Sequence, residues 1–174
     1  MSMDSKERYG KVTRTLHWAM AFFIGWQFLK FFDRIADGEH WVGENLVSWH
    51  SSVGAMILLL VILRVIWALK QKDNRPDNDP AVASLAKAGH RLLYAGMILL
   101  PITGMLYIKG LGYPIKAFGI QLFTGSGAET AWMIALGGLH SPIAWTLLII
   151  SVGHIGMALV HHFVKRDGVL QRML

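Results

Sequence analysis

Four long apolar runs dominate this sequence of 174 residues. They predict helices at about residues 14–35, 46–70, 88–108 and 131–164, and each run reaches the roughly 20 residues that a helix needs to cross a bilayer. Charged residues make up only 16% of the chain, whereas a soluble domain is nearer one quarter charged. The expected fold is therefore all-α, an integral membrane four-helix bundle that forms one domain over residues 1–174.

Several kinds of chemistry are excluded by residues that the sequence lacks. There is no cysteine, which rules out disulfides, thiolate-held iron–sulfur clusters and c-type haem attachment. The first apolar run follows basic residues without a small-residue cleavage site, so we expect it to be retained rather than removed as a signal peptide. No P-loop, Ser-His-Asp arrangement or His-Glu-x-x-His motif is found. No catalytic side chain is therefore expected.

The distribution of basic residues predicts the orientation in the membrane. Of the 17 Lys and Arg residues, only Lys30, Arg34, Lys109 and Lys116 fall on the side away from the termini. By the positive-inside rule, both termini are expected in the cytoplasm. The net charge of +6 then reflects orientation and contact with anionic membrane lipid, and no nucleic-acid partner is expected.

Histidines are the most informative residues within the apolar runs. Five lie in or at the edge of a run and two close the fourth run: His17, His50, His90, His140, His154, His161 and His162. Because an ionisable side chain is costly inside a bilayer, each is a candidate functional residue. The competing interpretation is a haem-free bundle in which these imidazoles only form hydrogen bonds between helices.

The spacing of the histidines favours paired sites at two depths. His140 and His154 are fourteen residues apart, which places them within about 40° of the same helix face and about 21 Å apart along the axis. His50 matches the depth of His140, and His17 is the best mate for His154. A pair of neutral imidazoles from facing helices can hold haem iron. The sequence thus offers two stacked bis-histidine sites in one bundle, with His161 as an alternative inner ligand.

These residues lie in local motifs that carry a family resemblance. The motifs are Glu7-Arg8-Tyr9-Gly10, His17-Trp18, Trp49-His50-Ser51-Ser52-Val53-Gly54, Arg64-Val65, Gly89-His90, Leu139-His140 with His154, and His161-His162-Phe163 with Lys165-Arg166-Asp167. Over nearly the whole chain they resemble the bacterial cytochrome b561 family, whose relatives include the b subunits of formate dehydrogenases and nickel hydrogenases.

The resemblance implies two b haems in a multi-pass protein of the bacterial inner membrane. One haem would be ligated by His50 with His140 on the periplasmic side. The other would be ligated by His17 with His154 on the cytoplasmic side. In short, stand-alone relatives, the implied activity is that of a superoxide:ubiquinone oxidoreductase. The alternative is a membrane anchor that relays electrons between quinone and a separate periplasmic redox partner.

The charge of the outer loops departs from the family pattern, which favours a basic outer surface that attracts an anion. Here four basic residues face five acidic ones, namely Asp33, Asp37, Glu39, Glu44 and Glu129. Lys109 and Lys116 can still focus an anion locally, and their loop is the alternative position for a quinone.

A cytoplasmic quinone pocket is expected around His161. It lies seven residues after His154, on the same face and about 10.5 Å further along the helix, where an imidazole can hydrogen-bond a quinone and pass it a proton. Arg64, fourteen residues after His50, is expected to neutralise a haem propionate or bind the quinone, and His90 would complete the pocket. The alternatives are that Arg64 only snorkels to the interface and that His161 contacts lipid phosphates.

Overall fold

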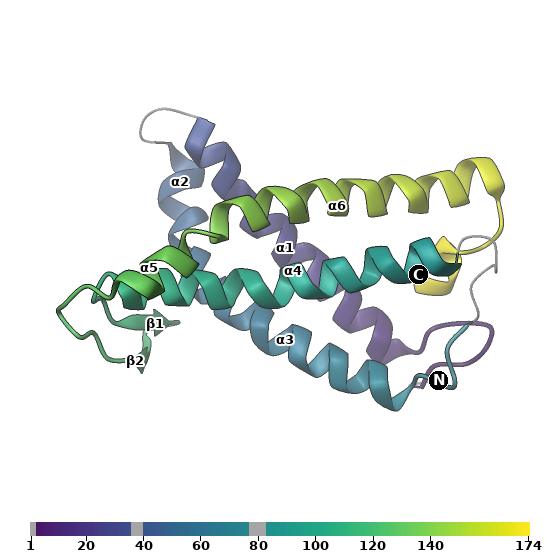
Figure 1. Cartoon of the computed structure of the whole chain (residues 1–174). Helices are drawn as coiled ribbons and strands as arrows, with labels where there is room; N and C mark the ends of the chain where they lie inside the picture. Colours follow the sequence, from purple (N-terminus) through teal and green to yellow (C-terminus); the bar gives the residue numbers. More distant parts are fainter. Residues whose placement is uncertain (1–2, 36–39, 77–82) are drawn as a thin grey trace.

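The protein is mostly helical and is built around four long helices (Figure 1). The computed structural model describes residues 3–35, 40–76 and 83–174. The long helices are α1 (Lys11–Ile35), α3 (His50–Lys70), α4 (Ala83–Gly110) and α6 (His140–Val160). Helix α1 packs on α3, α3 on α4, and α4 on α6. Both ends of the chain lie at the same end of these helices (Figure 1).

Shorter elements connect and close the long helices. They are α2 (Trp41–Asn45), a 3-10 turn (Val47–Trp49), α5 (Ala131–Gly137), a π-helical turn (His161–Lys165) and a 3-10 turn (Leu170–Met173). Between α4 and α5, strands β1 (Ile115–Ala117) and β2 (Ile120–Phe123) pair as an antiparallel hairpin. This hairpin lies at the opposite end of the molecule from the termini (Figure 1).

Three helical segments of the described chain are long and apolar enough to cross a membrane. They are Trp41–Lys70, Ser84–Gly110 and Ala131–Lys165, which correspond to the second, third and fourth predicted spans. Helix α1 has 25 residues but is not one of the three, because Gln27, Lys30 and other polar residues interrupt its apolar sequence. The first span therefore stays a prediction.

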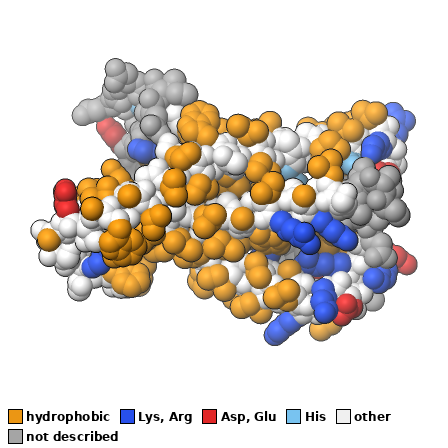
Figure 2. All heavy atoms as spheres, viewed as in Figure 1, with side chains coloured by type: hydrophobic (Ala, Val, Ile, Leu, Met, Phe, Trp, Pro, Cys, Tyr) orange, Lys and Arg blue, Asp and Glu red, His pale blue; other side chains and the backbone are white. Residues whose placement is uncertain are grey.

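The helices expose most of their apolar surface. Met20, Val61, Met97 and Leu147 form a small buried cluster, and only 6% of the most apolar window in the third segment is buried. Figure 2 shows hydrophobic side chains along the middle of the molecule and Lys and Arg gathered toward the end that holds the termini. Water solvates such a surface poorly, so the helices are suited to lipid.

The fourth apolar run was expected to form one continuous helix, but it forms two. Helix α5 ends at Gly137, and α6 begins at His140. A Cβ at position 137 would lie 2.6 Å from Cα of Tyr107, so glycine allows α5 to approach the backbone of α4. Gly137 thus serves helix packing, and the break places His140 at the start of α6.

The hairpin is a second difference, since the sequence predicts an all-α fold. Its turn consists of Phe118 and Gly119, which both have positive φ angles, 51° and 80°, as a tight hairpin turn requires. The backbone N–H of Phe118 donates to Oγ of Ser52 at 3.0 Å. The hairpin therefore lies against the start of α3.

Candidate functional site

Two histidines meet at the end of the molecule that carries the hairpin. His50 is the first residue of α3 and His140 the first of α6. Their ring centroids are 5.9 Å apart, with the ring planes at 76°. Both line a cavity of about 370 Å³ whose walls come from α1, α3, α4 and α6. Except for a few polar side chains, this cavity is apolar, with Ile24, Phe28, Ile57, Met97 and Ala144 among its lining residues.

Helix α4 orients the ring of His140. The Nδ1 atom lies 2.9 Å from the carbonyl oxygen of Leu100. Because a carbonyl oxygen only accepts, Nδ1 carries the hydrogen, which leaves the Nε2 lone pair available. Oγ1 of Thr103 lies 3.3 Å from the same Nδ1. A Cβ at Gly104 would lie 3.2 Å from the ring, so glycine makes room for the imidazole.

Helix α1 holds the start of α3 in place. Nε2 of Gln27 donates to the backbone oxygen of His50 at 2.8 Å. A Cβ at Gly54 would lie 3.3 Å from the same Gln27 atom, so this glycine accommodates the amide. Gln27 and Gly54 also line the cavity, and together they fix the helix that presents His50.

Three histidines gather near the other end of the long helices. The ring centroids of His17 on α1 and His154 on α6 are 6.3 Å apart, with the ring planes at 68°. His90 on α4 is also close to His154, at a centroid separation of 5.4 Å. Within the described residues, no three His, Asp or Glu side chains are close enough to bind a bare metal ion. His17 and His90 are thus two candidate partners for His154 in ligating a haem iron.

Arg64 lies beside His17, and we call the group of His17, His90, His154 and Arg64 the inner cluster. Its Nη2 atom donates to Nδ1 of His17 at 2.9 Å, and its Nε atom donates to the hydroxyl of Tyr94 at 3.1 Å. A guanidinium has no acceptor, so Nδ1 of His17 is unprotonated. In the neutral ring the hydrogen is then on Nε2.

Both histidine pairs have the spacing that axial ligation of haem iron requires. Two metal–nitrogen bonds of about 2 Å, with about 1 Å more from each nitrogen to its ring centre, separate two imidazole centroids by about 6 Å. The outer pair, His50 with His140, also has a cavity and an Nε2 lone pair on His140. The inner pair fits in spacing, but ligation through Nε2 of His17 needs its hydrogen on Nδ1, which requires Arg64 to move away.

The residues expected around a quinone separate into two groups. Arg64 and His90 lie with the inner histidines. His161 lies beyond α6, and its Nδ1 is 2.5 Å from Oδ2 of Asp167. Within the described part of the chain, His161 pairs with this carboxylate rather than with Arg64 or His90. The hydrogen bond with His161 holds the pKa of Asp167 below its usual range.

Some residues of the site were missed by sequence reasoning. Lys30 lines the outer cavity with the two histidines, and a charged residue near the end of an apolar run was the available signal. Tyr94 and Thr103 carry polar groups within a predicted span, which is a weaker signal. The carbonyl of Leu100 left no signal, because every residue has one.

Comparison with known proteins identifies the family of this chain. A model of the prokaryotic cytochrome b561 family matches residues 8–174. The chain belongs to this family. It is 30% identical over 181 residues to cytochrome b561 homolog 2 of Escherichia coli (strain K12), covering 98% of this chain and 93% of the relative. It is also 30% identical over 127 residues to the probable superoxide oxidase CybB of Yersinia pestis, covering 72% of each.

A further relative is cytochrome b562 of Cereibacter sphaeroides, which is 25% identical over 182 residues and is covered to 98%. The family predicted from the sequence motifs is thus confirmed. Members of the cytochrome b561 family are membrane proteins that bind b-type haem and transfer electrons. The chain is accordingly a haem-binding membrane oxidoreductase of electron transport.

Proposed function

We propose that this protein carries electrons across a bacterial inner membrane through two b haems. The outer haem is held by His50 and His140, and the inner haem by His17 and His154. The observation that carries the proposal is the pair of ring separations, 5.9 and 6.3 Å, at two positions fourteen residues apart on α6. Two such sites on one face of α6 place the haems at two depths, so electrons cross the membrane in two shorter transfers.

The proposed arrangement is a four-helix bundle with both termini in the cytoplasm, and residues 1–174 form one domain. Helix α1 is the remaining, first span of this bundle, because it packs along α3 and contributes His17 to the inner cluster. The clustering of Lys and Arg at the end with the termini (Figure 2) supports this orientation by the positive-inside rule.

The protein's own residues set the properties of each site. Bound haem supplies an iron that gains and loses one electron. Donation from Nδ1–H of His140 to Leu100 fixes the ring and makes Nε2 a stronger ligand. The apolar cavity excludes water, which influences the potential. At the inner site Arg64 is the cation available to a haem propionate.

The proposed donor is superoxide, which enters at the outer end. Each of two superoxide ions loses one electron and becomes dioxygen. The Yersinia pestis relative is named a probable superoxide oxidase, and Lys30 at the outer cavity provides a positive charge that attracts a small anion. Lys109, whose Nζ donates to the neutral carbonyl oxygen of Thr124, keeps its positive charge and adds to such a field.

The proposed acceptor is ubiquinone, which takes up both electrons and two protons near the cytoplasmic end. His161, oriented by Asp167, donates a hydrogen bond and a proton to the quinone. Arg64 and His90, which lie with the inner histidines, stabilise negative charge on the quinone.

One observation favours a second candidate function, a membrane anchor for a separate periplasmic redox partner. The hairpin exposes the side chains of Phe118, Ile120, Leu122 and Phe123. An exposed apolar patch of this kind is suited to docking a protein.

The test uses purified protein without any partner. We expect two low-spin haems per chain and rapid haem reduction by superoxide, followed by reoxidation by ubiquinone. In His161→Ala, both haem spectra and the reduction by superoxide should persist while reoxidation slows. A single haem, or no haem, would overturn the two-haem proposal. Haems that stay oxidised in superoxide until a partner is added would instead establish the anchor function.

A further inference from the structure

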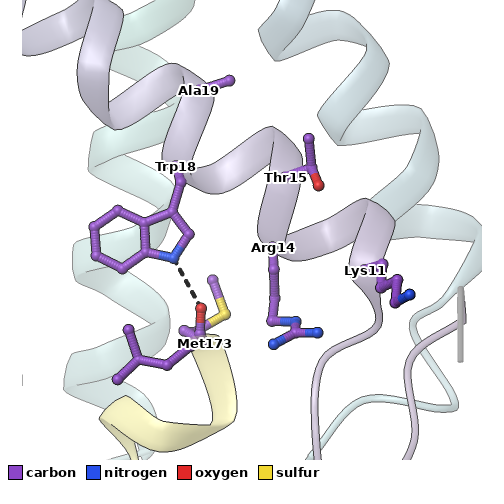
Figure 3. A pocket seen from close by; sticks show the side chains of 7 residues that line it. Lys11, Arg14, Thr15, Trp18, Ala19 and Met173 are labelled. Atoms are coloured by element: carbon purple, nitrogen blue, oxygen red, sulfur yellow. Dashed lines mark hydrogen bonds between the residues drawn. The ribbon is translucent and has the colours of Figure 1, made fainter.

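A groove between the start of α1 and the C-terminal tail lies outside the proposed redox sites. It has a volume of about 600 Å³ and is lined by Lys11, Arg14, Trp18, Ala19, Met173 and Leu174, together with one threonine. Figure 3 shows Arg14 and Lys11 on one side of this groove and Trp18 with Met173 on the other. The indole Nε1 of Trp18 donates to the carbonyl oxygen of Met173 at 2.8 Å, which holds the tail as a wall.

The basic side of the groove contains a buried hydrogen-bond donor, Nε of Arg14. Nε of Arg14 is shielded from solvent, and no hydrogen-bond acceptor reaches it among the described residues. A buried donor without an acceptor costs free energy, so an acceptor oxygen beside Arg14 would be stabilising. Lys11, one turn earlier on α1, adds a second positive charge. An anion with several oxygens would satisfy both side chains.

The groove changes from charged to apolar along α1. Lys11 and Arg14 occupy the first turn of the helix, and Trp18 and Ala19 follow one turn further into the apolar part of the chain. A phospholipid has the same order, with a charged phosphate followed by apolar chains. A quinone headgroup is uncharged and would leave both cations without a counter-ion.

We propose that this groove binds an anionic phospholipid of the cytoplasmic leaflet. The phosphate contacts Arg14 and Lys11, and one acyl chain lies along Trp18 and Ala19 against Met173. The site rests on the membrane orientation of the proposed function but on none of its haem or quinone assignments. Lipid bound here joins α1 to the tail.

The test measures lipid binding to the full, haem-loaded chain after delipidation. Phosphatidylglycerol is added and its retention is followed by native mass spectrometry. We expect the double variant Lys11→Gln with Arg14→Gln to bind phosphatidylglycerol roughly thirtyfold more weakly, since each of the two basic residues near an anionic lipid contributes about 1 kcal/mol. The matched control is Lys70→Gln with Lys72→Gln, at the same end of the molecule but outside the groove, which should bind like the parent.

A second measurement locates the acyl chain. Phosphatidylglycerol with brominated chains should quench tryptophan fluorescence in the parent, and Trp18→Phe should remove part of that quenching. Equal retention by the double variant and the parent overturns the site, as does equal binding of phosphatidylcholine. Full displacement by inorganic phosphate would identify a free-anion site instead, and displacement by ubiquinone a quinone site. The haem spectra of the double variant should be unchanged, so failure here is distinct from failure of the proposed function.

Discussion

Nη2 of Arg64 donates a hydrogen bond to Nδ1 of His17 at 2.9 Å, and this contact fixes the tautomer of the inner imidazole. The outer centre has the opposite arrangement, since Nδ1 of His140 donates to Leu100. The outer imidazole is therefore ready to ligate through Nε2, whereas the inner one becomes ready only when Arg64 turns to another partner. A haem propionate is a suitable partner, because a guanidinium binds carboxylates in a two-pronged geometry.

Replacing Arg64 should therefore change the inner haem selectively. We expect Arg64→Gln to lower the midpoint potential of the inner haem by on the order of 50 mV, because a nearby positive charge favours the reduced state. The outer potential should move much less. A redox titration followed by visible spectra measures both.

The control for this prediction is Arg91→Gln, which removes an exposed arginine from α4. It should leave both potentials close to those of the parent. If Arg64→Gln also leaves both unchanged, Arg64 is a snorkelling residue and not a propionate partner.

A second prediction distinguishes the two candidate mates of His154. The His17 ring lies at the separation of about 6 Å that bis-imidazole ligation requires, while His90 at 5.4 Å is closer than that. We expect His17→Ala to lose the inner haem and His90→Ala to keep two low-spin haems. Haem-to-protein ratios of the two variants decide the matter, with His162→Ala as the control. The reverse result would make His90 the inner ligand.

The paired histidines could be foreseen because helical geometry is regular. Fourteen residues on one helix define a common face and a known rise, and α6 runs unbroken from His140 to His154. The structure accordingly brings His140 to His50 and His154 to His17. The apolar runs also gave the long helices, since length and hydropathy are local properties of a sequence.

Other features depend on contacts between distant segments and could not be read from the chain. The turn of Phe118 and Gly119 lacks the Asn-Gly or Asp-Gly sequence that signals a hairpin, so the strands were not predicted. The proximity of His90 to His154 depends on how α4 packs on α6, which one helical pattern does not specify. The pairing of His161 with Asp167 depends on a π-helical turn and on Arg166 in the left-handed region, at φ 52°.

A third prediction concerns the space beside the outer ligand. In Gly104→Ala the new Cβ would lie 3.2 Å from the His140 ring, so the ring must shift by a few tenths of an ångström and its bond to Leu100 weakens. We expect faster loss of the outer haem on heating, equivalent to about 1 kcal/mol of overpacking. The decay of the outer-haem absorbance measures this loss.

Gly25→Ala is the matched control, because a Cβ there meets nothing within 4 Å. An alanine in an open helical position should be neutral or stabilise α1 by up to about 1 kcal/mol. If both variants retain the outer haem equally well, the imidazole does not need the space at Gly104.

The last prediction tests the carboxylate that pairs with His161. The hydrogen bond from His161 lowers the pKa of Asp167 below its ordinary value of 3.8, so the pair contributes fully above that value and is lost only as the pH falls through the lowered pKa. Asp167→Asn should slow reoxidation by quinone roughly threefold at neutral pH, a small effect because exposed ion pairs contribute little. Stopped-flow reoxidation of the reduced haems measures the rate. The control is Asp73→Asn, which changes an exposed acid in the connection after α3.

The reoxidation rates of the parent and of Asp167→Asn should converge at pH values well below 3.8, where the carboxyl group of the parent is also protonated. A rate equal to the parent's at neutral pH in Asp167→Asn, with a slow rate in His161→Ala, would mean that the imidazole acts without its carboxylate.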